Sequence, residues 1–332
     1  MSVTIHDVAK LAGVSHTTVS WAIHDNPSIS RGTKERVLKA IKELDYHPNA
    51  IARGLVNGKT GIIGVVANFF SSFFEMEIIK GIEQGLKTNK AHYSVNLFST
   101  MEHREDTLCK IVLEKRADAV ILLSISPTQK VCELYKRNNI PLIVVDESAP
   151  DAIEMGLNNY EGAYNATELL INTGKRNFAI VKGDSKNIDL SQNERKRGFI
   201  QALKDNGIPF DDSHVFYISD YYFEEGQIVF KKIEKNFPDI DGIFCAAGDV
   251  VATGIMLEAK KANKSIPKEL AIVGYDDFVA SALVTPSLST VHQPLNKIGK
   301  DAYLTALKLL NNEPIDWEEL KYTPTLIRRE ST

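Results

Sequence analysis

The sequence predicts a small all-α head followed by a larger α/β body of two lobes built on parallel sheets. Residues 1–46 carry helix-capping residues and apolar residues at helical spacing. From residue 61, short β-rich apolar runs alternate with amphipathic helical stretches, a pattern typical of right-handed βαβ units. The chain of 332 residues is too long for one typical domain, and nine or so strands exceed one comfortable sheet.

In the head, each expected helix begins at a capping residue. Thr4 precedes the first helix, and Asp7 completes a capping box. Gly13 breaks this helix, and Ser15 begins the next. Ser30 caps a third helix, whose apolar stripe is Val37, Ala40, Ile41 and Leu44. Three helices in residues 1–46 predict one small domain with its own core.

Residues 47–60 have the composition of a linker with one or two helical turns after Asn49. Gly54 weakens such a helix by roughly 1 kcal/mol relative to Ala, so we expect it to form only with a partner.

In the body, the expected strands are GIIGVVA, YSVNLFS, AVILLSI, LIVVDE, NFAIVKG, VFYIS, GIFCAA, LAIVGYDD and LSTVHQP. Helices are expected to begin near Glu75, Arg104, Gln129, Glu161, Asn193, Glu224, Val250 and Asn296. Ligands of such folds bind beyond the carboxyl ends of strands or between lobes.

Charge and cysteine usage limit the function. The net charge is −4, but residues 1–60 carry +3 and the remainder −7, which indicates an anionic partner for the head alone. Cys109, Cys132 and Cys245 form no CxxC pair, so we expect neither a disulfide framework nor a metal site, and a cytoplasmic location. The sequence has no apolar leader and no apolar run of 18 residues, so no membrane partner is expected.

Catalytic and nucleotide motifs are missing. RGLVNGKT resembles a phosphate-binding loop, but its first glycine is one residue too close and it follows a weak helix rather than a strand. No GxGxxG, GxSxG, HExxH or EF-hand pattern occurs. We therefore expect no catalytic residue and no cofactor, and the chain is predicted not to be an enzyme.

The stretch GVSHTTVSWAI, residues 13–23, has the form of a helix-turn-helix reader, yet it carries a tryptophan. On a helix, Val19, Ala22 and Ile23 share one face, and Thr17, Ser20, Trp21 and His24 share the other. The core face is therefore supplied without Trp21, which we expect to lie on a contact surface.

These residues resemble the DNA-binding head of the lactose/galactose repressor family. The match reads TI-DVA--AGVS--TVS and then T-ERV--AI-ELDY-PN--AR-L. It continues in family order through FFEMEIIKGIEQG, ADAVILL, IPLIVVD, RKRGFIQAL, GDVVATG, IPKELAIVGYDD and PSLSTVHQP. The chain is thus similar to the family over essentially its whole length.

The resemblance implies a dimeric transcription regulator with a head at 1–46, a hinge at 47–60 and a body at 61–332. The body is expected to resemble periplasmic sugar-binding proteins, with an N-lobe of about 61–159 and 291–320 and a C-lobe of about 160–290 and 321–332. A homodimer reads near-palindromic double-stranded operator DNA, with a tetramer left open as the larger assembly.

Residue roles at DNA also follow from the resemblance. In the major groove, the expected residues are His16, Thr17, Ser20 and Trp21. Hydroxyls that match backbone contacts are Thr4, Ser15, Ser20 and Thr33. Asn49 and Ala52 begin the hinge helix, with Asn49 at the backbone, and Ala52 and Leu55 lie in the minor groove, where Leu55 wedges between base pairs.

For the small-molecule effector, the matching positions are Phe73, Phe74, Ser124, Asp146, Arg195, Tyr221, Asp249, Asp276 and Gln293. Their carboxylates favour a hydroxyl-rich or cationic ligand, and a sugar or sugar derivative is the leading hypothesis. A purine corepressor is the runner-up, although Glu147 stands where purine-binding relatives carry an aromatic residue. Gly248 replaces a frequent asparagine. A solute-binding protein without a regulatory role and a sugar-processing enzyme are the alternatives from other classes.

Overall fold

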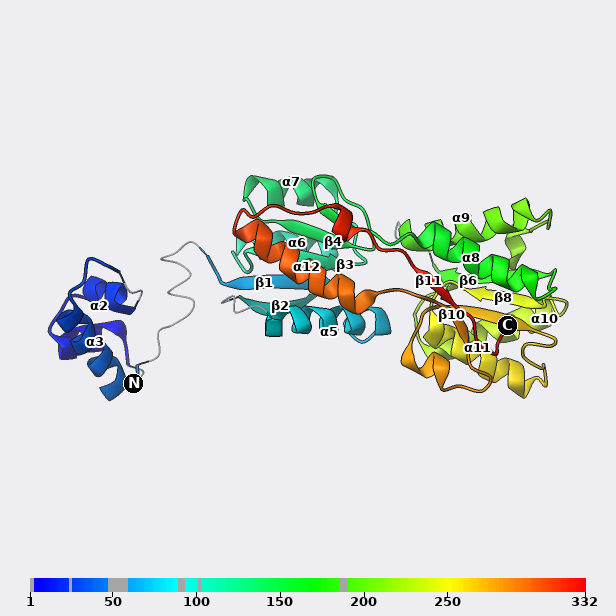
Figure 1. Cartoon of the computed structure of the whole chain (residues 1–332), viewed down its shortest axis with the longest axis horizontal. Helices are drawn as coiled ribbons and strands as arrows, with labels where there is room; N and C mark the ends of the chain where they lie inside the picture. The colour runs from blue at the N-terminus through cyan, green and yellow to red at the C-terminus, as the bar shows by residue number, and fades with distance from the viewer. Residues whose placement is uncertain (1–2, 24–25, 47–58, 89–92, 101–102, 185–189) are drawn as a thin grey trace. The chain divides into compact units, whose positions relative to one another are not determined.

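The computed structural model describes residues 3–23, 26–46, 59–88, 93–100, 103–184 and 190–332. The chain divides into two compact units, Met1–Gly61 and Ile62–Thr332 (Figure 1). The predicted hinge positions Asn49, Ala52 and Leu55 lie outside the described residues. Within the described part of the chain, no helix is both long and apolar enough to cross a bilayer.

The first unit contains three helices, α1 (Ile5–Ala12), α2 (His16–Ile23) and α3 (Arg31–Glu43). The backbone N–H and the hydroxyl of Thr4 both donate to the Asp7 carboxylate at the start of α1, and Gly13 ends α1 in the left-handed conformation. Ser30 accepts the Thr33 N–H and caps α3. The capping pattern predicted from the sequence is therefore confirmed.

Small apolar residues fill the core of this unit. The buried set is Val8, Ala9, Ala12, Val19, Ala22, Val37 and Ala40. Ile41 and Leu44 pack against it, so the predicted stripe of α3 faces the core. Because alanines make up four of the seven buried residues, the three helices can approach closely.

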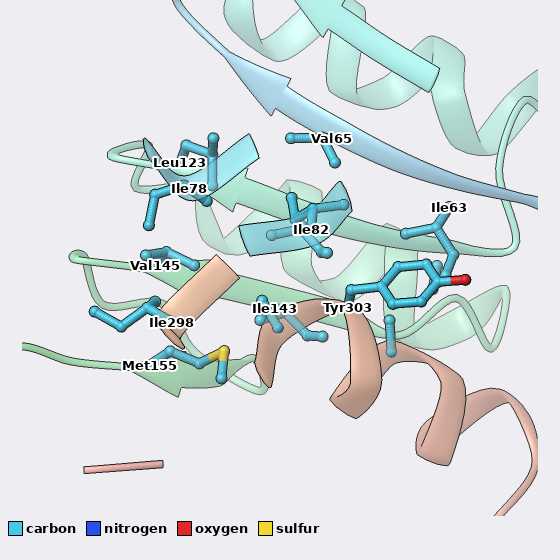
Figure 2. Packing of buried hydrophobic residues seen from close by; sticks show 14 of the residues in the cluster. Ile63, Val65, Ile78, Ile82, Leu123, Ile143, Val145, Met155, Ile298 and Tyr303 are labelled. Atoms are coloured by element: carbon cyan, nitrogen blue, oxygen red, sulfur yellow. The ribbon is translucent and has the colours of Figure 1, made fainter. Parts of the chain in front are cut away.

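The N-lobe of the second unit is a five-stranded parallel sheet with strand order β2-β1-β3-β4-β5. Its strands are β1 (Ile62–Ala67), β2 (Ser94–Ser99), β3 (Ala119–Leu123), β4 (Leu142–Val145) and β5 (Ile153–Met155). Its helices are α5 (Phe73–Thr88), α6 (Arg104–Leu113), α7 (Gln129–Arg137) and, from late in the chain, α12 (Leu295–Leu310). Figure 2 shows the core between this sheet and helices α5 and α12, around Ile63, Ile82 and Tyr303.

The C-lobe is a six-stranded sheet with strand order β11-β10-β9-β8-β6-β7. Its strands are β6 (Phe178–Gly183), β7 (Val215–Ile218), β8 (Gly242–Cys245), β9 (Ala271–Asp276), β10 (Ser289–His292) and β11 (Thr325–Ile327). Its helices are α8 (Asn159–Asn172), α9 (Leu190–Asp205), α10 (Phe223–Asn236) and α11 (Asp249–Lys261), with single turns η1 (Asp212–His214) and η2 (Val279–Ala282).

All nine runs predicted as strands form strands, but β5 and β11 were not predicted. Both span three residues, and β11 pairs antiparallel to β10 at the edge of an otherwise parallel sheet. Such short segments carry no detectable alternation, and their pairing depends on neighbours distant in the sequence.

The chain passes between the lobes three times. The passages follow β5 at Met155, β10 at His292 and η3 (Glu318–Leu320). Leu157 and Tyr322, from the first and third passages, form a parallel bridge. The lobes are therefore joined by a few extended backbone segments that lie side by side.

Helices α5 and α12 cross in the N-lobe through a reciprocal pair of glycines. A Cβ at Gly81 would lie 2.0 Å from the Asn296 carbonyl oxygen, and a Cβ at Gly299 would lie 2.0 Å from the Ile78 carbonyl oxygen. Neither position can accept a side chain unless the helices move apart, because the clash is with backbone.

We predict that Gly81→Ala lowers the free energy of unfolding of the body by about 1–3 kcal/mol, because overpacking outweighs the better helix propensity of alanine. Denaturant unfolding measures this change. Gly156→Ala is the matched control, since its Cβ would enter open space in the same unit. Equal stability of the two variants would show that the crossing tolerates a methyl group.

Candidate functional site

One face of α2 is polar and exposed. Val19 and Ala22 are buried, whereas His16 and Thr17 are exposed and Ser20 is half-buried. The side chain of Trp21 is 46% exposed, which confirms that it lies outside the head's core. A large apolar residue is thus presented to solvent on a face otherwise made of small polar groups.

Three of the four predicted backbone-contacting hydroxyls stand at helix N-termini, and the fourth, Ser20, lies within α2. Thr4 precedes α1, Ser15 precedes α2 and Thr33 lies in the first turn of α3. Helix N-termini also present unpaired backbone N–H groups. Hydroxyl groups and these N–H groups can both donate hydrogen bonds to phosphate oxygens. The Ser15 hydroxyl accepts the Thr18 N–H and forms a second hydrogen bond with the Thr18 hydroxyl. The Thr4 hydroxyl donates to Asp7 and must turn away from it to reach a phosphate.

In the body, the carboxyl ends of strands from both sheets meet at a cleft between the lobes. Ser124 follows β3, Asp146 follows β4 and Asp276 ends β9. All three line one cavity of about 140 Å³ together with residues from α5 and α9. This is the position where parallel α/β sheets bind ligands.

Six of the nine predicted effector residues line this cavity: Phe74, Ser124, Asp146, Arg195, Tyr221 and Asp276. Phe73 and Asp249 line an adjoining pocket that shares Phe74, Tyr221 and Asp276. Gln293 lies behind Asp276 and donates its amide Nε2 to the carboxylate. The structure thus gathers the predicted set around one cleft, and the role of each member in ligand binding stays a prediction.

Arg195 is buried and makes contacts with several elements. Its Nε donates to Asn159 Oδ1 at 2.8 Å, and its Nη1 donates to the Ala246 carbonyl at 2.8 Å. Its Nη2 lies 3.7 Å from Asp146 Oδ2, and the guanidinium stacks 3.8 Å from the centre of the Tyr275 ring. Among the described residues that line the cavity, Arg195 is the only cation.

Asp249 is engaged inside the C-lobe. Its carboxylate accepts the hydroxyls of Thr290 and Ser281, each at 2.7 Å, and the Phe278 N–H at 2.8 Å. Burial, reinforced by the charge of Asp276, raises the pKa of Asp249 to about 8 despite these donors. The contacts join α11 to β10 and the loop after β9, so any contact of Asp249 with a ligand would compete with three internal donors.

Backbone conformation aims the strand-end side chains into the cleft. Ser124, Asp146 and Asp276 have positive φ of 49°, 61° and 98°, which non-glycine residues adopt at a cost of about 1–3 kcal/mol each. Gly248 has φ of 107°, and a Cβ there would lie 2.9 Å from Asp276 Oδ2. A side chain at this position would therefore have to adopt a strained backbone and displace the Asp276 carboxylate.

Glu75 is a cavity residue that the sequence pattern did not predict as a binding group. It lies in the first turn of α5, is 6% exposed, and lines the cavity beside Phe74. Its Oε2 has no hydrogen-bond partner. Burial, and secondarily the charge of Asp276, raises the pKa of Glu75 to about 7.

The other lining residues that were not predicted are Asn68, Phe69, Ser72, Ser191, Gln192 and Ala247. Asn68 and Ala247 closely follow strands β1 and β8 in the described structure. Their positions after predicted strands could have identified them as candidate cavity residues from the sequence. In the sequence alone, Glu75 is only an acid at a helix start, because burial of that turn depends on the opposite lobe.

Besides the Arg195–Asp146 pair, two further contacts join the lobes around the cavity. The rings of Phe73 in the N-lobe and Phe278 in the C-lobe meet edge to face at 4.3 Å. Glu147, after β4, accepts the Leu190 N–H at the start of α9 at 3.1 Å and the Ser126 hydroxyl at 2.6 Å. Glu147 is therefore used between the lobes rather than as part of the cavity wall.

We predict that Glu75→Gln raises the free energy of unfolding by up to about 3 kcal/mol above pH 7. The folded-state pKa of Glu75 lies above the usual 4.5, so the wild-type carboxyl opposes folding increasingly as pH rises from 4.5 to 7. The advantage of the variant should grow through that window and vanish below it. Denaturant unfolding across pH measures the difference, and a variant less stable than wild type at high pH would contradict it.

The comparisons with known proteins agree over both units. Residues 4–49 match the family model of bacterial regulatory proteins, lacI family, and residues 167–332 match a periplasmic binding protein-like domain. Catabolite control protein A of Priestia megaterium is 30% identical over the full length of both chains. The HTH-type transcriptional regulator RegA of Clostridium saccharobutylicum is 31% identical, again over both full lengths.

Solved structures show the same architecture. A complex of the transcriptional regulator CelR with cellobiose aligns with a TM-score of 0.72 at 25% identity, over 99% of this chain and 100% of that chain. The lac repressor dimer bound to operator and the anti-inducer ONPF aligns with a TM-score of 0.81 at 22% identity, over 100% and 99%. With a head and a body that both match along the chain, and relatives that are regulators rather than enzymes, this protein belongs to the LacI family of DNA-binding transcription regulators.

Proposed function

We propose that this regulator is a repressor whose affinity for operator DNA is switched by a small molecule, a sugar or sugar derivative, bound between the lobes of the body. The observation that carries the proposal is the cleft itself. Strand ends from both sheets place carboxylates, a guanidinium and aromatic rings around one cavity, the residue types that hold hydroxylated rings. The protein acts in the cytoplasm, where the DNA is.

The head supplies the DNA contacts in this proposal. His16, Thr17, Ser20 and Trp21 face the major groove, and Thr4, Ser15 and Thr33 hold phosphates from the helix N-termini. Asn49, Ala52 and Leu55 of the hinge complete the contacts in the minor groove. Two copies of the chain read a near-palindromic operator, because a two-fold dimer presents two equivalent heads.

The body supplies the switch. A ligand can change operator affinity only if it binds the closed and open arrangements of the lobes differently. The Phe73–Phe278 and Glu147–Leu190 contacts exist only when the lobes meet, and a ligand that touches both lobes favours that arrangement. Closure then alters the spacing of the two N-lobes in the dimer, which sets whether the hinges can engage DNA together.

The sugar hypothesis is favoured over a purine by the role of Glu147 between the lobes. Glu147, at the position where purine-binding relatives carry an aromatic residue, is occupied by Ser126 and the Leu190 N–H and offers no stacking surface. The solved complex of CelR with cellobiose supports a sugar, because that regulator shares this fold. A solute-binding protein without a regulatory role would not need the head.

We predict that Trp21→Arg changes the preferred operator toward guanine at one position of each half-site, since arginine grips guanine bidentately for roughly 1–3 kcal/mol of discrimination. Indole has one donor and a broad apolar surface, so wild-type Trp21 favours thymine methyl groups or sugar edges. Binding-site selection on random DNA reads out the change.

Trp21→Ala is the matched variant, because it removes the indole without adding a donor. It should lower affinity and relax the same position. Both variants should unfold within about 0.5 kcal/mol of wild type, because the side chain is outside the core. An unchanged consensus in Trp21→Arg would show that Trp21 does not read bases.

We predict that a saturating sugar effector changes the operator Kd by about 5–150-fold. Fluorescence anisotropy on a selected operator, titrated with a panel of sugars and purines, measures the change. Removal of residues 1–60 should abolish DNA binding and leave ligand binding intact. A response to purines alone would establish the runner-up, and ligand binding without any change in operator affinity would refute the switch.

A further inference from the structure

Two buried oxygen atoms beside the cavity have no hydrogen-bond donor within the described structure. They are Oε2 of Glu75 and Oε1 of Gln293. Their side chains are 6% and 2% exposed. Buried acceptors are normally paired, because an unpaired acceptor loses its hydrogen bonds to water and gains none in the folded protein. Both side chains neighbour Asp276, and their unpaired oxygens indicate that a donor from outside the chain completes the site.

Asp276 links these two side chains. Gln293 Nε2 donates to Asp276 Oδ1, and this bond fixes the amide, since the opposite orientation would set Oε1 against a carboxylate. Asp276 is also the charged neighbour that acts on Glu75. We call Glu75, Asp276 and Gln293 the acceptor cluster. Its free positions are all acceptors, and two of its three members are carboxyl groups.

The chain itself provides little positive charge to the acceptor cluster. Arg195 acts on the charge of Asp276, but its donors are directed to Asn159, Ala246 and Asp146. Glu75 has no cation among the groups that act on it. The described cavity lining contains three carboxyl groups, those of Glu75, Asp146 and Asp276, and one cation, the guanidinium of Arg195. The two unpaired oxygens consequently lack a donor, and the three carboxyl groups share one cation in the described cavity lining.

We propose that the acceptor cluster binds a protonated amine of the effector, so that the effector is an amino sugar or a related amino polyol. A primary ammonium group carries three donors and one positive charge, which matches what the cluster lacks. A hydroxyl group can supply one donor but leaves the charge uncompensated, and a phosphorylated sugar would add negative charge. The inference rests on the proposed function and names the chemical class of its effector.

The test compares amino sugars with their neutral parents on the full-length protein. The probes are D-glucosamine and D-glucose, D-galactosamine and D-galactose, and D-mannosamine and D-mannose, measured by calorimetry at about pH 7, where amine and carboxyl can both be charged. At least one amino sugar should bind about tenfold or more tightly than its parent.

Glu75→Gln should abolish that preference, because it removes the carboxylate that would pair with the ammonium group. Glu83→Gln is the matched control, because Glu83 lies on the same helix but is exposed, and it should keep the preference. The comparison on wild-type protein needs no variant, so it stands even where a substitution impairs folding.

The proposal is overturned if no amino sugar is preferred over its parent, or if Glu75→Gln retains the preference. Operator affinity, measured with the same ligands, separates this result from the proposed function. A neutral sugar or purine that alone changes operator affinity refutes the amine and leaves the switch standing. An amino sugar that binds through Glu75 without changing operator affinity supports the amine and refutes the switch.

Discussion

The body depends on one buried guanidinium. Arg195 extends from α9 and reaches the residue that begins α8, the backbone after β8, the ring of Tyr275 on β9, and, across the cleft, Asp146 after β4. A charge that is withdrawn from water must be fully engaged, so these elements are held at fixed positions around it. The cavity wall is therefore a consequence of satisfying Arg195, and the wall leaves no spare cation for the other carboxyl groups that line it in the described structure.

That shortage gives a physical basis for the proposed switch. Glu75 and Asp276 are costly to bury as anions, and burial raises the pKa of both. The cost exists when the lobes are closed and falls when water enters an open cleft. A ligand that brings donors or positive charge to these groups gains most in the closed arrangement. The differential affinity that any allosteric effect requires thus follows from the electrostatics of the wall.

Local signals in the sequence were sufficient for most of the helices and strands. Capping residues such as Thr4 and Ser30 mark helix starts, and apolar runs mark strands, because both effects act over a few residues. Strands β5 and β11 were missed since three residues carry no pattern. The effector set came from family resemblance. Glu75 was missed because it lines a cavity formed by both lobes. The local sequence FFSSFFEMEI does not show which residues of the other lobe lie beside it.

Trp21 and Glu75 both depart from the rule that apolar side chains are buried and charged side chains are exposed, in opposite directions. One is a large apolar side chain that the head leaves 46% exposed, and the other is a carboxyl group that the body buries to 6% exposure. The head's core is complete without the indole, and Glu75 Oε2 has no partner. Exposed large apolar side chains and buried unpaired oxygens are expected at functional positions. These two positions are therefore where the proposed operator preference and the proposed effector preference depart from the common scaffold of the family.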